Sequence, residues 1–292
     1  MQKDMDYTLE KLKQGLNLTK ISAIGQAFVL SKWERLLPQT KAYVEAIMSD
    51  WPAFPKIWES LNMPPNLDEG ERSVLMVAAY CFMMPSSHQL YLERGYTEDM
   101  WLEAMPDISW HAHDKDDGTL WLDTCNNEFN WHFSILNAHN ITLGRLQFYQ
   151  RISPFDFPEY GVAKDDNVAG FHIPANGPLD IEACKASFRR AQEFFAKYHP
   201  DWDFKGFFCQ SWFLNPIYRN YLPKTANILR FQNLGKAINY TNNSKDAIRR
   251  VFTFRGVSID NPNPPTKMQR AIQAIIRDGN SIANGAIFIP KQ

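Results

Sequence analysis

A strand, a covering helix and a second strand follow one another between residues 169 and 212. The apolar run Phe171–Ile173 is closed by Pro174 and by the turn signal Asn176-Gly177-Pro178, which predicts a strand. Asp180 can cap the helix that follows. The apolar residues of this helix recur at spacings of three and four, as on one amphipathic face: Ile181, Cys184, Phe188, Ala191, Phe195 and Tyr198. The run Gly206–Cys209 predicts the second strand, so this stretch forms a βαβ-like unit.

Polar side chains stand at or near the ends of these two strands: His172, Gln210 and Ser211, with Trp212 beside them. In open α/β sheets, ligands bind where such strands end. A neutral histidine near pH 7 can remove a proton from an amine, and a hydroxyl can protonate a leaving thiolate. The structural alternative is that His172 bonds a backbone carbonyl and Ser211 caps the next helix. Cys209 lies in an apolar run, which favours an inert buried thiol over a nucleophile.

Residues 1–140 have a helical pattern throughout, and residues 141–292 mix strands and helices. We expect a helix over Ala23–Leu36 that ends at Pro38, a separate helix over Lys41–Trp51, and a buried helix over Ser73–Met84. Further expected helices cover Met5–Leu16, the segments after Thr97 and Met105, and Asn126–Asn140. Expected strands of the second half are Ile141–Ile152, Asn227–Gln232, Val251–Phe254 and a last strand over Asn284–Pro290. A short helix is expected at Leu214–Tyr221, and a helix capped by Thr266 is expected to run through Ile276. The sequence therefore predicts a helical domain over 1–140 and an α/β domain over 141–292.

The net charge of −1, from 31 basic and 32 acidic residues, gives no electrostatic sign of nucleic-acid binding. Four widely spaced cysteines, one of them Cys125, indicate reduced thiols rather than a disulfide framework. The chain has no apolar run of membrane-spanning length, and no apolar signal segment at its start. These features predict a cytoplasmic protein that does not interact with membranes.

Two polar clusters could bind a metal or a phosphate. His111 and His113 would point about 200° apart on a helix, so we expect a solvated acidic helix end at Trp110–Asp117 and no metal. The run Gln232-Asn233-Leu234-Gly235-Lys236-Ala237 matches Q-x-x-G-x-A, a pattern in which backbone N–H groups at a helix start cradle a coenzyme A pyrophosphate. A glycine within a strand or hairpin explains the run equally well.

Polar residues also alternate along two expected strands. Arg145 and Gln147 would share one sheet face, and so would Arg230 and Gln232, with Asn227 on the same strand as the latter pair. If that face is covered, these groups line a polar cleft that could bind substrate. If it is solvated, they are ordinary surface residues.

Several blocks recur in the order of a known family: L-G-R-L-Q-F at 143–148, H-I-P-A-N-G-P-L-D at 172–180, C-x-x-S-F-x-x-A-x-x-F-F at 184–195, C-Q-S-W-F-L-N-P at 209–216, N-I-L-R-F-Q at 227–232 and T-K-M-Q-R-A-I at 266–272. Over about residues 70–290 the chain resembles bacterial acyltransferase-domain proteins, which pair a helical N-terminal domain with a GNAT-like C-terminal domain. It differs from them at Asn215, where the resemblance implies an acid, and at Tyr149, where it implies Glu.

The resemblance implies an α+β protein in which a mixed sheet flanked by helices follows an all-helical domain. It implies an N-acyltransferase that uses acyl-CoA as co-substrate and a small-molecule amine or peptide as acceptor. His172 is then the candidate base, Ser211 the candidate proton donor or oxyanion contact, and Trp212 part of the acceptor pocket. A GNAT-like core places its pyrophosphate loop between a strand and the following helix. Gln232–Ala237, Arg255-Gly256 and Asn176-Gly177 are three candidates for that loop, and a GNAT-shaped binding module without catalysis is the alternative function.

Overall fold

The computed structural model describes residues 5–49, 51, 66–123, 129–241 and 245–291. The chain divides into two compact units, one holding Met1–Leu143 with Pro174–Asn176, the other Gly144–Ile173 with Gly177–Gln292. Cys125 and the expected helix breaks around residues 52–65 lie outside the described residues. None of the described helices combines the length and the apolar character of a membrane span.

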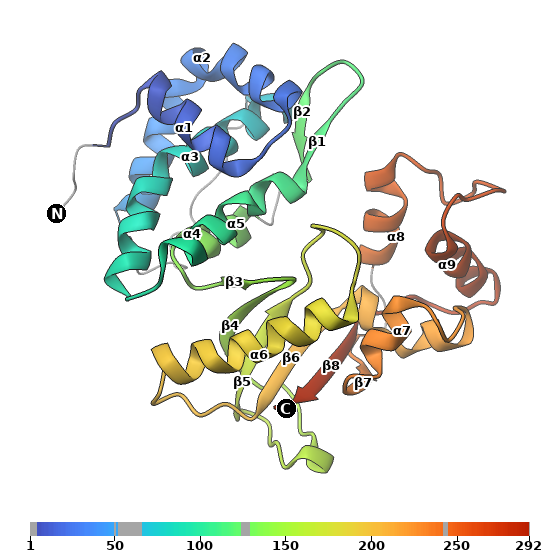
Figure 1. Ribbon diagram of the computed structural model, residues 1–292. Helices are drawn as coiled ribbons and strands as arrows, with labels where there is room; N and C mark the ends of the chain where they lie inside the picture. Colours follow the sequence, from blue (N-terminus) through green and yellow to red (C-terminus); the bar gives the residue numbers. More distant parts are fainter. Residues whose placement is uncertain (1–4, 50, 52–65, 124–128, 242–244, 292) are drawn as a thin grey trace. The chain divides into compact units, whose positions relative to one another are not determined.

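The first unit is built from helices around a long central one (Figure 1). Its helices are α1 (Leu9–Thr19), α2 (Ala23–Met48), α3 (Glu69–Glu93), α4 (Glu98–Ala104), the 3-10 helix η1 (Met105–His111) and α5 (Phe129–Leu136). Every residue of α3 from Ser73 to Met84 is buried, which confirms the expected buried helix. A capping box at Asp68 and Glu71 starts α3, because the Asp68 side chain accepts the Glu71 N–H and the Glu71 side chain accepts the Asp68 N–H.

Two expectations for this unit are wrong. Pro38 does not separate two helices but lies inside α2, and Pro85 lies inside α3. A proline within a helix costs about 3 kcal/mol, and burial of α2 residues on both sides of Pro38 offsets that cost because α2 packs along α3. The second error lies at residues 112–122, where β1 (Ala112–Asp114) and β2 (Leu120–Leu122) form an antiparallel hairpin that was not predicted.

A mixed sheet has the strand order β3-β4-β5-β6-β8-β7, and all of its strands except β3 lie in the second unit. The strands are β3 (Ile141–Leu143), β4 (Leu146–Ile152), β5 (Asn167–His172), β6 (Gly206–Ser211), β7 (Lys236–Asn239) and β8 (Gly285–Pro290). Strands β5 and β6 are parallel, whereas β4–β5, β6–β8 and β7–β8 are antiparallel. The helices of the unit are η2 (Pro158–Tyr160), α6 (Ile181–Tyr198), η3 (Trp212–Leu214), η4 (Pro216–Asn220), α7 (Asn227–Gln232), α8 (Asp246–Val251), η5 (Thr253–Arg255) and α9 (Lys267–Arg277). The expected GNAT-like mixed sheet after a helical N-terminal half is confirmed.

Aromatic side chains fill both faces of this sheet. On one face, α6 crosses the strands (Figure 1), and its Phe188 ring lies 5.2 Å from that of Phe171 and 4.7 Å from that of Phe207. On the other face, the segment between β4 and β5 provides Phe157, which stacks on Phe288 with ring centroids 5.0 Å apart. The sheet is therefore packed with aromatic side chains on both of its faces.

Three expected strands of the second half have different structures. Ile141–Ile152 is the hairpin β3–β4, because Gly144 adopts a left-handed φ of 79° and turns the chain. Asn227–Gln232 is helix α7: a six-residue run is too short for its period to separate strand from helix, and packing decided the outcome. Val251–Phe254 covers the end of α8 and the start of η5. The helices α6 and α9 are confirmed, each with its expected cap at Asp180 and Thr266.

Candidate functional site

The parallel strands β5 and β6 diverge toward their carboxyl ends. They pair only at Ala169–Phe207 and Gly170–Phe208 among the described residues. Beyond this point each strand stays paired on its other side only. β5 pairs with β4 as far as His172, and β6 pairs with β8 as far as Ser211. The predicted residues therefore stand at the same edge of the sheet, on either side of an opening between two strands.

The two candidate catalytic side chains project from opposite faces of the sheet. Register places His172 opposite Gln147, on the face that also carries Gly170 and Phe208. Ser211 is three residues beyond Phe208 in the same extended strand, so it projects from the α6 face. Its hydroxyl accepts the Phe213 N–H at 3.4 Å, as the structural alternative for Ser211 implied. The side chains of His172 and Ser211, which we expected to act in one reaction, are therefore on different faces of the sheet.

His172 shares its face with two neighbours on β4, the buried Gln147 and the half-buried Tyr149. Gln147 is fully buried and lies directly across from it, at the spacing of side chains in an antiparallel pair, about 5 Å between Cβ atoms. The Tyr149 ring covers Gly170, where a Cβ would come within 2.5 Å of the ring carbons. Burial raises the pKa of Tyr149, so its phenol stays protonated at neutral pH. The two side chains enclose one side of His172.

Arg145 holds the segment that links β5 to α6. Its Nε donates to the Pro178 carbonyl at 2.9 Å and its Nη2 to the Gly177 carbonyl at 3.0 Å. The Arg145 backbone N–H donates to the Ser187 hydroxyl at 2.8 Å, which ties the β3–β4 turn to α6. Partial burial lowers the pKa of Arg145 from its usual value, but the guanidinium stays charged at neutral pH. A fixed positive charge therefore stands at the loop before α6.

A pocket of about 330 Å³ opens beside this loop. Its lining comes from the start of α6, η3, the segment before α7 and the start of α9: Leu179, Phe213, Leu222, Pro223, Thr225, Ala226, Asn227, Ile228, Lys267 and Met268. Of the predicted substrate residues, Asn227 is thus in a pocket, and the lining is mostly apolar with one cation. Sequence reasoning missed Leu179, although it directly precedes the cap residue Asp180.

Gln232 and Gly235 have clear structural roles. The buried Gln232 amide donates to the Asn215 carbonyl at 3.1 Å and to the Phe213 carbonyl at 3.4 Å, which anchors the segment after β6. A Cβ on Gly235 would lie 2.0 Å from the Phe288 carbonyl oxygen, so this position requires glycine for close approach to β8. The run leads from helix α7 into strand β7, with Ala237 inside that strand. The helix start expected after this motif is absent from the described residues that follow it directly.

The remaining predicted residues are dispersed. Arg230 is exposed while Gln232 is buried, because residues two apart on the helix α7 face different sides. Arg255 and Gly256 are exposed, and Gly256 ends η5 with a φ of 62°. Trp212 is half-buried against the core of α7–α9. Of the three candidate pyrophosphate loops, only that containing Asn176-Gly177 runs from a strand into the next helix.

The model of one protein family, the GNAT-like C-terminal domain, matches residues 141–288. The chain belongs to this family. This GNAT-like protein also resembles solved acyltransferases: a variant in complex with octanoyl-CoA (20% identity, TM-score 0.75, 97% of this chain and 88% of that one), an acyltransferase with decanoyl-CoA and teicoplanin (20%, 0.74, 97% and 88%), and one with CoA and 10C-teicoplanin (20%, 0.75, 96% and 88%). At this identity the likeness establishes the fold alone. None of the curated proteins matches the chain significantly.

Asn215, where the resemblance implied an acid, uses its amide as both donor and acceptor. Its Nδ2 donates to the Ala283 carbonyl at 2.9 Å, and its Oδ1 accepts the Ile217 N–H at 2.8 Å. A carboxylate could accept but not donate, and it would face the Ala283 carbonyl oxygen in a buried place. The amide therefore fits this chain better than an acid does.

We expect Asn215→Asp to lower the free energy of unfolding of the GNAT-like protein by about 1–3 kcal/mol, the cost of a buried carbonyl left without its donor. Urea denaturation followed by tryptophan fluorescence measures this change. Asn220→Asp, at an exposed position of η4, is the matched control and should leave the midpoint unchanged. Equal stability of both variants would contradict the role of the amide.

The histidine cluster of the helical unit is a network of contacts between imidazole rings and carboxylates. His111 ends η1 and His113 lies on β1, not on one helix, and both rings contact Asp123, at 2.8 and 3.2 Å. His132 and Asp107 form a second pair at 2.6 Å, fully buried. Hydrogen bonds from the two histidines lower the pKa of Asp123 despite the opposing effect of its burial. Among the described residues, no group of three His, Cys, Asp or Glu side chains could hold a metal ion.

Proposed function

We propose that this GNAT-like protein is an N-acyltransferase that takes its acyl group from an acyl-CoA thioester. One observation carries the proposal: in a domain of this family, β5 and β6 diverge next to a strand–loop–helix connection that the half-buried Arg145 holds. The similar acyltransferases, which were solved with CoA or acyl-CoA, support the same donor. The pocket beside the loop provides an apolar wall for the donor.

The donor site we propose extends from the loop before α6 to the opening between β5 and β6. Diverging strand edges suit an extended amide chain such as pantetheine, which can add strand-like hydrogen bonds. The CoA phosphates would lie at the Gly177–Asp180 loop, where Arg145 and the N-terminal end of the 18-residue helix α6 provide positive potential. Lys267, at the rim of the pocket, adds a second cation.

In the proposed reaction an amine nitrogen attacks the thioester carbonyl carbon. The C–N bond forms and the C–S bond breaks, so the products are an amide and the CoA thiol. His172 takes the proton that the amine loses, and the leaving thiolate is protonated in turn. Gln147 opposite His172 would position the imidazole. Ser211 as proton donor or oxyanion contact remains a prediction, since its hydroxyl caps η3 on the other face of the sheet.

The acceptor we propose is a small molecule or peptide with a primary amine. Two of the similar acyltransferases were solved with teicoplanin or 10C-teicoplanin, which supports a peptide-like acceptor. Direct transfer needs no acyl-enzyme intermediate. It is also consistent with Cys209, because burial raises the pKa of that thiol to about 12 and keeps it protonated.

We expect CoA and decanoyl-CoA to bind, and Arg145→Ala to weaken CoA binding about tenfold or more. Two charge-assisted hydrogen bonds from Arg145 hold the loop, and each contributes about 1.5–3 kcal/mol to the stability of its conformation. Without them the loop relaxes, so part of the free energy of CoA binding is spent on ordering it again. Isothermal titration calorimetry measures the affinities of both ligands.

Arg189→Ala is the matched control for this experiment. Arg189 is an exposed arginine of α6, so its removal should leave CoA affinity within twofold of the unmodified protein. Absence of any heat with CoA and decanoyl-CoA would overturn the proposed function. Tight binding without release of thiol in the presence of amines would instead favour a non-catalytic binding module.

A further inference from the structure

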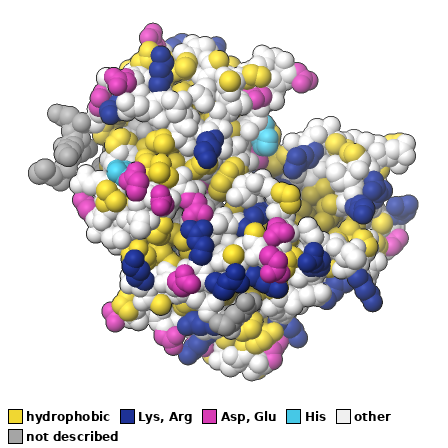
Figure 2. Space-filling model, viewed as in Figure 1, with side chains coloured by type: hydrophobic (Ala, Val, Ile, Leu, Met, Phe, Trp, Pro, Cys, Tyr) yellow, Lys and Arg dark blue, Asp and Glu magenta, His cyan; other side chains and the backbone are white. Residues whose placement is uncertain are grey.

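The near-neutral net charge of the chain conceals a strong separation of charge. Residues 1–143 carry 20 acidic and 11 basic side chains, whereas residues 144–292 carry 12 acidic and 20 basic ones. Within the second half the excess is confined to the part after β6, because residues 212–292 carry 12 basic and only 3 acidic side chains. Figure 2 shows Lys and Arg gathered over the region of α8 and α9. The C-terminal part of the second half is therefore markedly basic, although the chain as a whole is nearly neutral.

Helix α9 carries part of this charge along one side. Arg270 and Arg277 are seven residues apart, so they lie on the same side of the helix about two turns from one another. Both line a groove of about 460 Å³ whose other walls come from Pro262, Asn263, Pro264 and Gln273. We call this groove, with Arg270 and Arg277 on its edge, the α9 groove. It is distinct from the pocket beside α6, which α9 reaches only with Lys267 and Met268.

The cations of the α9 groove are not neutralised by nearby carboxylates. Within the described residues, Arg255, Arg270 and Arg277 form no ion pair, and Arg270 donates instead to the Pro264 carbonyl at 2.8 Å. Of the three acidic residues of 212–292, Asp246 lies 3.8 Å from Arg249, Asp278 accepts the Tyr221 hydroxyl, and Asp260 is exposed two residues before the Pro262 wall. The positive potential of the groove is therefore directed at solvent.

The proposed CoA site does not account for these cations. Lys267 stands at the donor pocket, but Arg277 is ten residues further along α9, about 15 Å by the rise of the helix. A CoA molecule whose pyrophosphate lies at the α6 loop has one further charged group, the 3′-phosphate of its ribose, and one phosphate is too little charge for Arg255, Arg270 and Arg277 together. The α9 groove is thus placed beside the donor site without being part of it.

We propose that the α9 groove docks an acidic acyl carrier protein, which presents the acyl group on a phosphopantetheine arm. This inference rests on the proposed function, because the arm has the same pantetheine thioester as acyl-CoA and would enter the same opening between β5 and β6. What a carrier protein adds is a folded acidic surface at the base of the arm. An acidic surface complements the segment 212–292, which carries 12 basic and 3 acidic side chains.

A folded protein fits this face better than a nucleic acid or a lipid surface does. The basic side chains stand next to apolar ones, with Ile276 of α9 41% exposed and a proline-rich wall at 262–265. A mixed patch of cations and rigid apolar groups is typical of protein interfaces, where a few apolar anchors are surrounded by charge. Binding to RNA or to anionic vesicles is therefore an outcome that the experiment must be able to show.

The test compares two donors with the same acyl group: decanoyl-CoA, and a bacterial fatty-acid-synthesis acyl carrier protein loaded with a decanoyl group. Dissociation constants of the full chain are measured at low and at physiological salt. We expect the double variant Arg270→Glu/Arg277→Glu to bind the loaded carrier at least tenfold more weakly, and decanoyl-CoA within twofold of the unmodified protein. Binding of the carrier should weaken as salt rises, because the contact is electrostatic.

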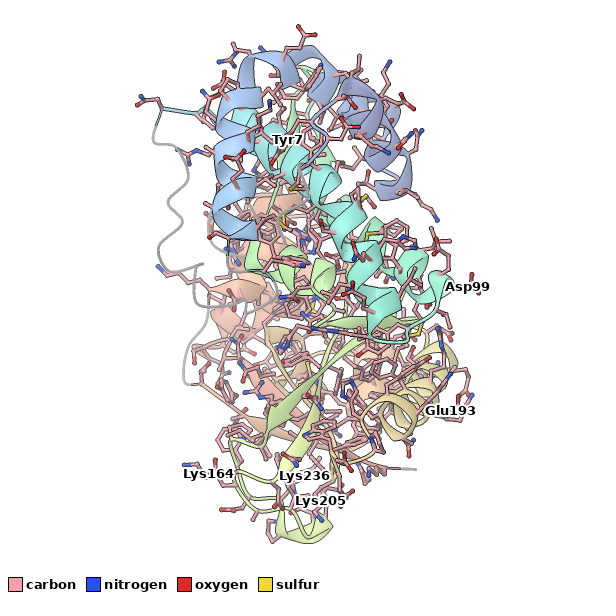
Figure 3. All side chains as sticks on the ribbon, turned by 90° about the vertical axis from the view of Figure 1, so that its left-hand side faces the viewer. Tyr7, Asp99, Lys164, Glu193, Lys205 and Lys236 are labelled. Atoms are coloured by element: carbon pink, nitrogen blue, oxygen red, sulfur yellow. The ribbon has the colours of Figure 1, made fainter. Side chains whose placement is uncertain are left out.

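The matched control is Lys164→Glu/Lys205→Glu. These lysines precede β5 and β6, so they lie at the opposite end of the sheet from the proposed donor site, where Figure 3 shows them together with Lys236. The control variant should bind both donors as the unmodified protein does. Unchanged decanoyl-CoA affinity and melting temperature show that each charge-reversed variant is folded.

Three results would overturn the proposal. The first is that the loaded carrier does not bind although decanoyl-CoA does. The second is that the α9 variant loses affinity for both donors equally, which would assign Arg270 and Arg277 to the CoA phosphates. The third is tighter binding to a single-stranded RNA or to vesicles with anionic lipid than to the carrier. If neither donor binds the unmodified protein, the proposed function fails with it, and this result is distinguishable from the first.

Discussion

Replacing His172 with alanine is expected to lower kcat/KM for acyl transfer by a factor of about 10² to 10⁴, the usual contribution of a general base. The reason is positional: His172 is the histidine at the carboxyl end of β5, on the edge where β5 and β6 diverge. Release of CoA thiol from decanoyl-CoA, with a panel of primary amines and amine-bearing peptides, measures the rate. Affinity for decanoyl-CoA should change little, since the proposed donor contacts lie on the loop and on the strand edges.

Ser211→Ala provides the comparison within the same site. Because Ser211 projects from the other face of the sheet and caps η3, we expect its loss to change kcat/KM by less than about tenfold. A second histidine variant, His199→Ala at the far end of α6, should retain the rate of the unmodified enzyme. Full turnover by His172→Ala would remove His172 as the base, and a larger loss in Ser211→Ala would assign the main proton transfer to Ser211.

Phe188→Ala is expected to destabilise the GNAT-like unit by about 3–5 kcal/mol, the range for an aromatic side chain deleted from a packed core. The Phe188 ring is completely buried and contacts rings from four other elements, Phe148 of β4, Phe171 of β5, Phe207 of β6 and Phe231 of α7. No neighbouring side chain can move into the vacated volume without leaving its own contacts. The loss is read from hydrogen exchange of the β5 and β6 amides, which reports on this unit separately from the helical one.

Lys197→Ala on the same helix is the control for Phe188→Ala. Lys197 is exposed, and its ammonium lies 4.7 Å from the Tyr198 ring, a contact worth well under about 1 kcal/mol at the surface. Phe188→Leu should fall between the two, because it keeps most of the apolar volume. A loss below about 1 kcal/mol in Phe188→Ala would show that the ring cluster does not carry the stability assigned to it.

The elements that could be predicted from sequence are those whose local signals agree. Helix α6 has a cap at Asp180 and a long apolar face, and α9 has the capping box of Thr266 and Gln269, so their positions followed from residue spacing. Helix α7 has six residues and no side-chain cap, so nothing local distinguished it from a strand. Pro38 shows the opposite case, a strong local signal that long-range packing overrode.

The candidate site likewise could be predicted from sequence only in part. The strand ends at His172 and Ser211 followed from apolar runs and turn residues, but the face to which each side chain points depends on pairing with β4 and β8. A shift of one residue in that pairing would exchange the two faces, and no local pattern fixes it. The pocket beside α6 was equally inaccessible, since its lining comes from four separate segments of the second half of the chain.

The strand order has a consequence for how the chain folds. β8 is the last of the sheet strands to be synthesised, yet it lies between β6 and β7 and pairs with both over most of its length. Until it arrives, the facing edges of two earlier strands have no partner, and apolar residues such as Phe208 lack a wall. The nascent GNAT-like unit therefore exposes unpaired strand edges from the synthesis of β6 until β8 is complete, and exposed edges of this kind favour aggregation of partial chains.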